Sequence, residues 1–305
     1  MEEIVPSNPS SKRYAVVTGG NKGIGLEICR QLASNEILVI LTARDEKRGN
    51  EAVENLKRSG LSDVIFHQLD VKDPSSIASL ANFIKTHFRK LDILVNNAAD
   101  GGVIIDGEAF RGLRSGFDTV SDERPELLKG IMEQTNEKAE ECLKTNYYGT
   151  KGVTEALLPF LQLSDSARIV NVTSVYGQLT FISNEKVKSE LNNVECLREE
   201  RLDEILQWFL KDFKEDKVQV NGWPITVSAY KVSKAAVNAY TRILARKFPN
   251  MRINCVHPGY VKTDITCNTG FLTAEEGARP LVKLALLPDN GPSGHYFNRM
   301  DMSTF

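Results

Sequence analysis

Tyr230 and Lys234, four positions apart, form the residue pair with the clearest chemical use in this sequence. On a helix, that spacing places the phenol and the ammonium on one face. A nearby cation stabilises phenolate and lowers the tyrosine pKa, which suits the tyrosine to proton transfer. Residue frequencies predict about one chance match in a chain of this length, and Tyr147 with Lys151 repeats the pattern here. Neighbouring residues must therefore decide between the two pairs.

A glycine-rich turn, residues 18–25, lies between an expected strand and an expected helix. Glycines at such a turn let a diphosphate approach the N–H groups that begin the helix. The spacing is not GxGxxG, and the absence of a GK[ST] ending excludes a P-loop. We expect this turn to bind a dinucleotide.

The end of the second expected strand indicates which nicotinamide cofactor fits. An acidic residue there binds the ribose hydroxyls of NAD, whereas a 2′-phosphate calls for arginine. Arg44 occupies that place, with Arg48 one helical turn further on and Lys22 in the glycine turn. The sequence therefore predicts NADP(H), and Lys47 is expected to be only a solvated helix residue.

These residues are positioned by a series of short apolar runs that alternate with helical patterns. Strands are expected at residues 14–18, 38–42, 64–68, 93–96, 168–173, 252–257 and 294–297. Helices are expected at residues 23–34, 45–59, 74–88, 136–161, 199–213 and 228–247, and from residue 273. This alternation predicts an α/β fold with a doubly wound, Rossmann-like parallel sheet that binds ligands at the carboxyl ends of its strands.

Two irregular, charged stretches interrupt the series at about residues 100–134 and 176–226. We interpret them as insertions into a single domain, residues 13–305, which follows a flexible tail, residues 1–12. Because both stretches follow strand ends, we expect them to form a roof over the nicotinamide. In the last helix, Pro280 predicts a kink or a late start.

Composition excludes several classes of protein. The 305 residues include 38 Lys and Arg against 40 Asp and Glu, so the net charge of −2 argues against a nucleic-acid partner. No apolar run approaches the roughly 18 residues of a membrane span, and the first residues do not resemble a signal peptide. Five cysteines without CxxC spacing favour the cytoplasm. The histidines lack the spacing of metal ligands, so we expect no metal site. The sequence contains no GxSxG motif, which argues against a serine hydrolase.

The motifs, taken in order, resemble the short-chain dehydrogenase/reductase family over nearly the whole chain. They are the turn at residues 18–25, Asp70-Val71, Asn96-Asn97-Ala98, Asn146, Ser174, Tyr230 with Lys234, and Pro258-Gly259 before Thr263. The long interval between Ser174 and Tyr230 is similar to the plant branch that contains salutaridine reductase and menthone reductases. In that branch an insertion covers the usual subunit interface, which implies a monomer here.

The resemblance implies a role for each matching residue. Tyr230 donates a proton to the carbonyl oxygen as hydride arrives, and Ser174 hydrogen-bonds the same oxygen. Lys234 lowers the tyrosine pKa and binds the nicotinamide ribose, while Asn146 holds a water that links Lys234 to solvent. The predicted cofactor contacts are Gly19, Asn21, Lys22, Gly23, Ile24, Gly25, Arg44, Arg48, Asp70, Val71, Asn97, Tyr230, Lys234, Pro258, Gly259, Val261 and Thr263.

Three positions depart from the family pattern. Ala99 stands where glycine is usual, so the backbone there is expected to be less free. Thr173 replaces a serine, a change expected to be harmless. His257 precedes Pro258 where close relatives often carry cysteine. One interpretation is that it tunes polarity beside the nicotinamide, but we expect instead that its ring is satisfied by backbone hydrogen bonds.

The predicted activity is NADPH-dependent reduction of a small carbonyl compound. A bulky cyclic ketone of terpenoid or alkaloid type is implied by the resemblance, and broad aldehyde and ketone reduction is equally compatible. Some plant relatives reduce an activated C=C bond instead and carry an acid at the tyrosine position. The other alternative is a nucleotide-binding sensor or scaffold without turnover.

Overall fold

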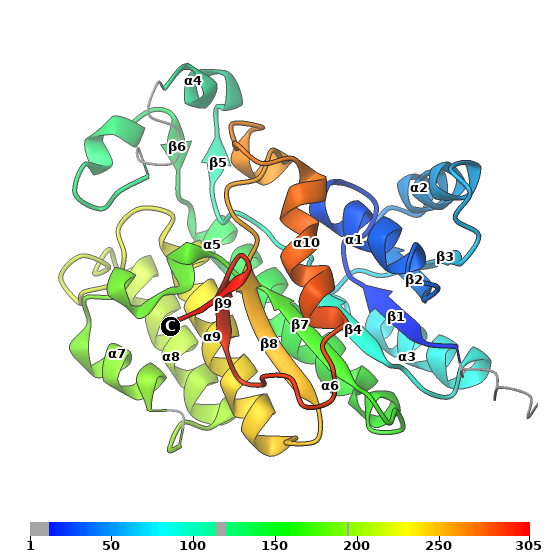
Figure 1. The fold of residues 1–305 in the computed structure, drawn as a ribbon. Coiled ribbons are helices and arrows are strands. Elements are labelled where there is room, and N and C mark those ends of the chain that lie inside the picture. Colours follow the sequence, from blue (N-terminus) through cyan, green and yellow to red (C-terminus); the bar gives the residue numbers. More distant parts are fainter. Residues whose placement is uncertain (1–11, 114–119, 194) are drawn as a thin grey trace, which may run out of the picture.

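The computed structural model describes residues 12–113, 120–193 and 195–305, and a doubly wound sheet forms its centre (Figure 1). The strand order is β10-β9-β8-β7-β4-β1-β2-β3, and every pair is parallel except β9 with β10. The strands are β1 (Tyr14–Val17), β2 (Leu38–Ala43), β3 (Val64–Gln68), β4 (Ile93–Asn96), β7 (Arg168–Val172), β8 (Arg252–His257), β9 (Tyr296–Asn298) and β10 (Asp301–Ser303). The predicted fold class is confirmed, because the chain order reverses between the neighbours β1 and β4.

Helices cover both faces of this sheet, and each face has its own apolar core. On one face pack α1 (Gly23–Ala33), α2 (Glu46–Arg58) and α10 (Ala274–Ala285). On the other pack α3 (Pro74–His87), α5 (Asn136–Leu143), α6 (Thr150–Leu161) and α9 (Ser228–Lys247), and α8 (Glu199–Lys214) packs in turn against α5 and α9. The strands are apolar on both sides because both sides are buried, as the sequence pattern indicates.

Local sequence signals explain where several helices begin. Asp73 caps α3 by accepting a hydrogen bond from the Ser75 amide, and a proline follows it in the first turn. Thr273 and Glu276 form the predicted capping box, so α10 begins directly after Thr273. The expectation of a late start at Pro280 is therefore wrong, since α10 continues through that residue to Ala285.

The helix predicted over residues 136–161 is interrupted. Between α5 and α6 lies a single π-helical turn, Lys144–Gly149, which contains Asn146. The apolar periodicity of the flanking helices hides one wider turn, so the sequence pattern did not reveal it. Such turns occur frequently at functional sites.

Short strands were also missed. β5 (Ile104–Ile105) and β6 (Met132–Glu133) pair antiparallel in a separate two-stranded sheet, and β10 returns antiparallel along β9. Two or three residues are too few for an alternating pattern to be recognised.

The two predicted insertions lie in different places. The first carries α4 (Gly107–Gly112) with β5 and β6, and it stands beyond the edge of the sheet at which the parallel strands end (Figure 1). The second carries α7 (Glu185–Asn192) and α8, which pack beside α9 instead. The roof expectation is therefore wrong for the helices of the second stretch. The predicted tail lies outside the described residues except for Lys12, which pairs with Asp63.

Candidate active site

Parallel strands bring the predicted chemistry to one edge of the sheet. β1, β4 and β7 are neighbours in register, so their carboxyl ends lie side by side. The glycine turn follows β1, Asn97 follows β4 and Ser174 follows β7. This is the edge at which open α/β sheets bind ligands.

At this edge the Tyr230 phenol lies close enough to the Ser174 hydroxyl for the serine to lower the phenol pKa. Tyr230 lies in the first turn of α9, and Ser174 caps the short turn that follows β7 by accepting from the Tyr176 amide. Burial raises the pKa of Tyr230 to about 12, although the neighbouring Ser174 opposes the shift. The predicted pair of hydroxyls is therefore assembled.

Lys234 lies one helical turn after Tyr230. Its Nζ atom is 5.5 Å from the centroid of the Tyr230 ring and donates to the Val172 carbonyl oxygen at 2.8 Å. Burial lowers the pKa of this ammonium to about 8. The phenol thus has a buried cation beside it, as the four-residue spacing predicts.

The rival pair does not reach this edge. Tyr147 is fully buried between helices and makes an edge-on ring contact with Tyr240. Lys151 forms an ion pair with Asp203 of α8 at 2.7 Å. These contacts connect the π-helical turn and α6 to the helices beside them, so the second Tyr-x-x-x-Lys match is structural.

Asn146 lies in the π-helical turn, and both the nitrogen and the oxygen of its side-chain amide form hydrogen bonds. Its Nδ2 donates to the Asp100 carbonyl oxygen and to the Ser233 hydroxyl, both at 2.9 Å. Its Oδ1 accepts from the Asp100 amide at 2.7 Å. The side chain joins the segment after β4 to α9, close to Lys234 along the helix.

The glycine turn has a backbone that only glycine adopts easily. Gly19 and Gly23 have left-handed φ values of 63° and 55°, and a Cβ added at Gly25 would overlap the Gly19 carbonyl oxygen. Asn97 fixes the turn from β4, because its Nδ2 donates to the carbonyl oxygens of Thr18 and Gly19. At the start of α1, Lys22 supplies no side-chain cap. The free first N–H groups of a helix favour an anion, so the residues here fit a dinucleotide diphosphate.

The loop after β8 closes over the start of α1. Lys22 forms an ion pair with Asp264, and a Cβ added at Gly23 would lie 3.4 Å from Thr263. Val261 is buried and packs on α10 at Gly277. The predicted contact residues Val261 and Thr263 therefore lie beside the predicted turn residues Ile24 and Gly23, while Pro258 and Gly259 directly follow β8 and Asn21 is half-buried in the turn.

The two predicted phosphate-binding arginines differ in their surroundings. Both are exposed, and Arg48 lies 4.0 Å from the carboxylate of Asp45, the cap of α2. Within the described residues, the Arg44 guanidinium makes no hydrogen bond or ion pair, while its carbonyl accepts from Gln68. Arg44 directly follows β2, and its guanidinium is more available to a ligand than that of Arg48.

Asp70 and Val71, the predicted adenine contacts, follow β3. The Asp70 carboxylate accepts from the Lys72 amide at 3.0 Å, so it shapes the turn into α3. Val71 packs against Gly149, where an added Cβ would lie 2.8 Å from its side chain. This contact connects the β3 end to the π-helical turn.

The three departures from the family pattern have separate outcomes. Ala99 is exposed and does not have a positive φ, so its backbone does not need glycine. Thr173 is buried, and its hydroxyl donates to the Lys234 carbonyl at 3.4 Å. The ring of His257 makes no hydrogen bond to any described residue, so the expected backbone partner is wrong. Burial lowers the pKa of His257 to about 4, with Arg299 adding to the effect.

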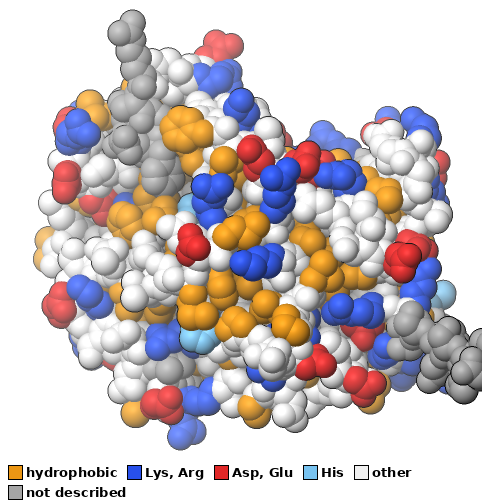
Figure 2. Space-filling view, viewed as in Figure 1, with side chains coloured by type: hydrophobic (Ala, Val, Ile, Leu, Met, Phe, Trp, Pro, Cys, Tyr) orange, Lys and Arg blue, Asp and Glu red, His pale blue; other side chains and the backbone are white. Residues whose placement is uncertain are grey.

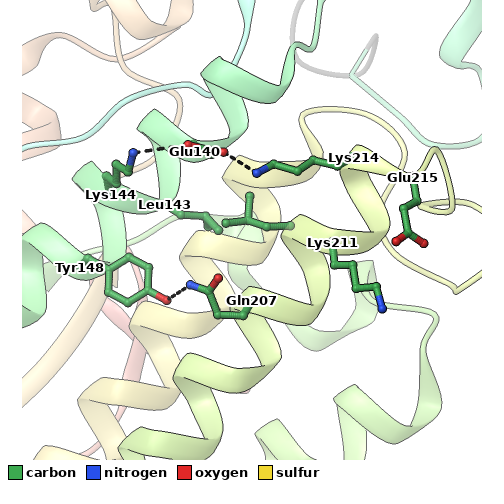
Figure 3. A pocket seen from close by; sticks show the side chains of 9 residues that line it. Glu140, Leu143, Lys144, Tyr148, Gln207, Lys211, Lys214 and Glu215 are labelled. Carbon is green, nitrogen blue, oxygen red and sulfur yellow. Dashed lines mark hydrogen bonds and ion pairs between the residues drawn. The ribbon is translucent and has the colours of Figure 1, made fainter.

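A surface pocket of about 490 Å³ lies away from this edge, between α8 and the end of α5 (Figure 3). Glu140 pairs there with Lys214 at 2.7 Å and with Lys144 at 3.4 Å. Gln207 donates to the Tyr148 hydroxyl at 3.0 Å. None of the predicted site residues lines this pocket.

Other classes of site receive no support within the described residues. No group of three or more His, Cys, Asp or Glu side chains could hold a metal ion there, and no helix is long and apolar enough to cross a membrane. On the face drawn in Figure 2, basic side chains are interspersed with acidic ones. The surface of this face thus has mixed charge.

Comparison with known proteins decides the family. Residues 13–185 match the family described as short chain dehydrogenase. The chain belongs to the short-chain dehydrogenase/reductase family. It is therefore an oxidoreductase of a family that uses NAD(P). Residues 218–290 match a second description, enoyl-(acyl carrier protein) reductase.

Several members of this family are similar over almost their whole length. Salutaridine reductase of Papaver somniferum is 52% identical over 312 residues, 100% of both chains. Its solved structure has a TM-score of 0.87 at 53% identity and covers 94% of this chain and 99% of its own. (+)-Neomenthol dehydrogenase of Capsicum annuum is 51% identical, covering 97% of this chain and 98% of its own. Carbonyl reductase [NADPH] 3 of Mus musculus is 38% identical, covering 94% and 95%.

Some residues around the site were not found from the sequence. Asp122, Gln134 and Lys231 make the contacts that surround the start of α9. Asp122 and Gln134 lie in a stretch without apolar periodicity, and nothing in the sequence distinguishes Lys231 from other helix lysines. No pattern in the sequence connects them.

Proposed function

We propose that this protein is an NADPH-dependent carbonyl reductase with Tyr230 as its general acid. The observation that carries the proposal is that Tyr230 and Ser174 lie together at the strand ends, with the Lys234 ammonium 5.5 Å from the centroid of the tyrosine ring. Two hydroxyls that share one edge of the sheet can both bind a single carbonyl oxygen. The same groups catalyse alcohol oxidation in reverse when the cofactor ratio favours it.

Tyr230, Ser174 and Lys234 have separate roles in the proposed proton transfer. NADPH, when bound, supplies the hydride that reduces the carbonyl carbon. The Tyr230 hydroxyl gives its proton to the carbonyl oxygen, while the Ser174 hydroxyl donates a hydrogen bond to the same oxygen. Lys234 stabilises the phenolate left behind. One proton from solvent then restores the phenol.

Asn146 is the proposed start of that solvent path. Its Oδ1 accepts one hydrogen bond, from the Asp100 amide, and an amide oxygen has a second lone pair. A water held by that lone pair could pass a proton toward Lys234, whose helix Asn146 already contacts through Ser233.

The preference for NADPH rests on Arg44. Its guanidinium follows β2, where the ribose of the adenosine lies in this fold, and it has no described carboxylate partner. Arginine binds phosphate through two parallel hydrogen bonds. The glycine turn and the uncapped start of α1 fit the diphosphate of either cofactor.

The proposed substrate is a bulky apolar ketone of the terpenoid or alkaloid class, with simpler aldehydes and ketones as further substrates. Tyr230 packs against an apolar cluster from the first insertion that includes Val103, Phe110 and Leu128. An apolar wall beside the acid favours an apolar substrate. The names of the similar proteins, a salutaridine reductase and a neomenthol dehydrogenase, agree with this class.

We also propose a monomer in the cytoplasm. The second insertion places α8 against the flank of α9, where its apolar residues Leu202, Ile205 and Phe209 are buried. A flank covered from within one chain is not available to a second subunit. The cysteines of the described residues are all free thiols, as a reducing compartment favours. Sedimentation at several concentrations and imaging of a tagged chain test the two statements.

The test is NADPH oxidation with a panel of cyclic ketones and enones. Tyr230→Phe is expected to abolish turnover while NADPH still binds, because only the phenolic hydroxyl group is lost. Tyr147→Phe is the matched control, since it alters the other Tyr-x-x-x-Lys tyrosine, and it should keep turnover. Equal activity of wild type and Tyr230→Phe would contradict the proposed acid. Product analysis separates C=O from C=C reduction, and no turnover with any substrate would favour a sensor or scaffold.

A further inference from the structure

Val227, the residue before α9, has a left-handed backbone, with φ 42° and ψ 43°. A β-branched residue rarely adopts this conformation, and such strain persists only where surrounding contacts impose it. Tyr230 lies three residues further on. The direction in which α9 starts, and with it the position of the phenol, therefore depends on whatever holds Val227.

Two side chains of the first insertion hold the backbone on both sides of Val227. Gln134 accepts from the Ser228 amide at 2.6 Å, and its Nε2 donates to the Ile225 carbonyl oxygen at 2.7 Å. Asp122 accepts from the amides of Ile225 and Thr226, at 3.2 Å and 2.8 Å. Four backbone groups around one strained residue are thus bound by two side chains distant in sequence.

Lys231 connects the same contacts to α9. Its side chain is fully buried, and its Nζ donates to Asp122 at 2.7 Å and to the Thr226 hydroxyl at 2.9 Å. The ammonium also lies 5.3 Å from the ring centroids of Tyr176 and Phe181, at the start of the second insertion. Loss of Asp122 would leave the fully buried Lys231 ammonium without its carboxylate, which costs much stability, so Asp122 is held in this position although its own side chain is 29% exposed.

We infer that Asp122 and Gln134 are positioning residues that hold the turn at residues 225–228 so that Tyr230 meets Ser174. The inference rests on the proposed function of Tyr230. It assigns to the first insertion a second role besides lining the substrate space: proton donation requires this insertion to be folded against α9.

The first experiment compares Gln134→Ala and Asp122→Asn with wild type for kcat and for the Kd of NADPH. Both variants are expected to lower kcat at least ten-fold while the Kd of NADPH changes less than two-fold, because the glycine turn is untouched. Adding Val227→Gly to Gln134→Ala should raise kcat at least three-fold, since glycine adopts the left-handed conformation without strain. Asp203→Asn is the matched control, because it removes another Lys–Asp pair, on α8, and should leave kcat within two-fold.

A kcat within two-fold of wild type for both variants would overturn the inference. The inference would also be overturned if adding Val227→Gly did not raise the kcat of Gln134→Ala. If Asp122→Asn does not fold, Gln134→Ala decides, because Gln134 is half-buried and carries no charge.

Hydrogen exchange provides a readout that does not depend on turnover. In Gln134→Ala, amides of residues 225–231 should exchange at least ten-fold faster while those of α8 are unchanged. Unaltered exchange at residues 225–231 would refute the positioning role by itself. Wild-type protein that reduces no carbonyl compound would contradict the proposed function instead, and the exchange result would still decide whether Gln134 holds the turn.

Discussion

The Lys234 ammonium lies between the Tyr230 ring, 5.5 Å from its centroid, and the Val172 carbonyl oxygen, to which it donates at 2.8 Å. The carbonyl belongs to the last residue of β7, and Ser174 follows two residues later. The lysine thus connects the strand that carries the serine to the helix that carries the tyrosine. Burial brings its pKa to about 8, so this contact changes with pH near neutrality.

We expect kcat for ketone reduction to fall as pH rises through about 8. Lys234 loses its proton there, and the phenolate formed in the reaction then lacks its neighbouring cation. The phenol itself, with a pKa of about 12, titrates too high to cause this limb. Rates across the pH range should show the fall in wild type, and Lys234→Arg should lack it because arginine stays charged. If kcat of the arginine variant falls at the same pH as that of wild type, the fall must come from another group.

Arg44→Glu should weaken NADPH binding about 100-fold or more and leave NADH binding nearly unchanged. A charge-assisted hydrogen bond contributes about 1.5–3 kcal/mol, and the new carboxylate repels the 2′-phosphate. Titration of each cofactor by fluorescence measures both constants. Lys47→Glu makes the same charge change three residues further on and should have little effect. Equal losses for NADPH and NADH in Arg44→Glu would refute the phosphate contact.

Gly25→Ala should weaken binding of both cofactors and lower the free energy of unfolding by about 1–3 kcal/mol. The added methyl overlaps the Gly19 carbonyl oxygen, so the turn must shift. Gly152→Ala in α6 is the control, because its methyl would meet only the end of the Ile77 side chain at 3.3 Å. Denaturant unfolding and cofactor titration measure the two effects. An alanine variant at residue 25 with wild-type affinity would show that the turn tolerates a side chain.

His257 should make the protein less stable as pH falls from about 6.5 to about 4. Its pKa is about 4 when folded and 6.5 when unfolded, so the unfolded chain binds more protons in this window. At 1.36 kcal/mol for each pKa unit, the loss is at most about 3.4 kcal/mol. Unfolding of wild type and His257→Gln at pH 7 and pH 4.5 isolates this contribution from that of the carboxylates. Identical losses in both proteins would mean that His257 does not contribute.

The sequence predicts well those features that depend on the spacing of apolar residues and on the chemistry of neighbouring residues. The parallel strands, the caps at Asp73 and Thr273 and the order of the motifs follow from apolar runs and turn residues. The choice of Tyr230 over Tyr147 follows from the residues around each, and the structure brings only Tyr230 to Ser174.

Features that depend on contacts between distant segments escape such a prediction. A valine predicts an extended backbone, yet Val227 is left-handed because Gln134 and Asp122 bind the residues around it. The π-helical turn at Asn146 is one wider turn within two ordinary helices. Neither feature changes the local pattern of residue types, so only the folded chain shows them.

The position of α8 has a consequence for how this protein behaves on dilution. α8 lies against the helix that carries both Tyr230 and Lys234, and it comes from the same polypeptide. The two proposed proton-transfer groups thus obtain this support without any contact between molecules. Specific activity should therefore remain constant from the most concentrated preparation to the most dilute assay.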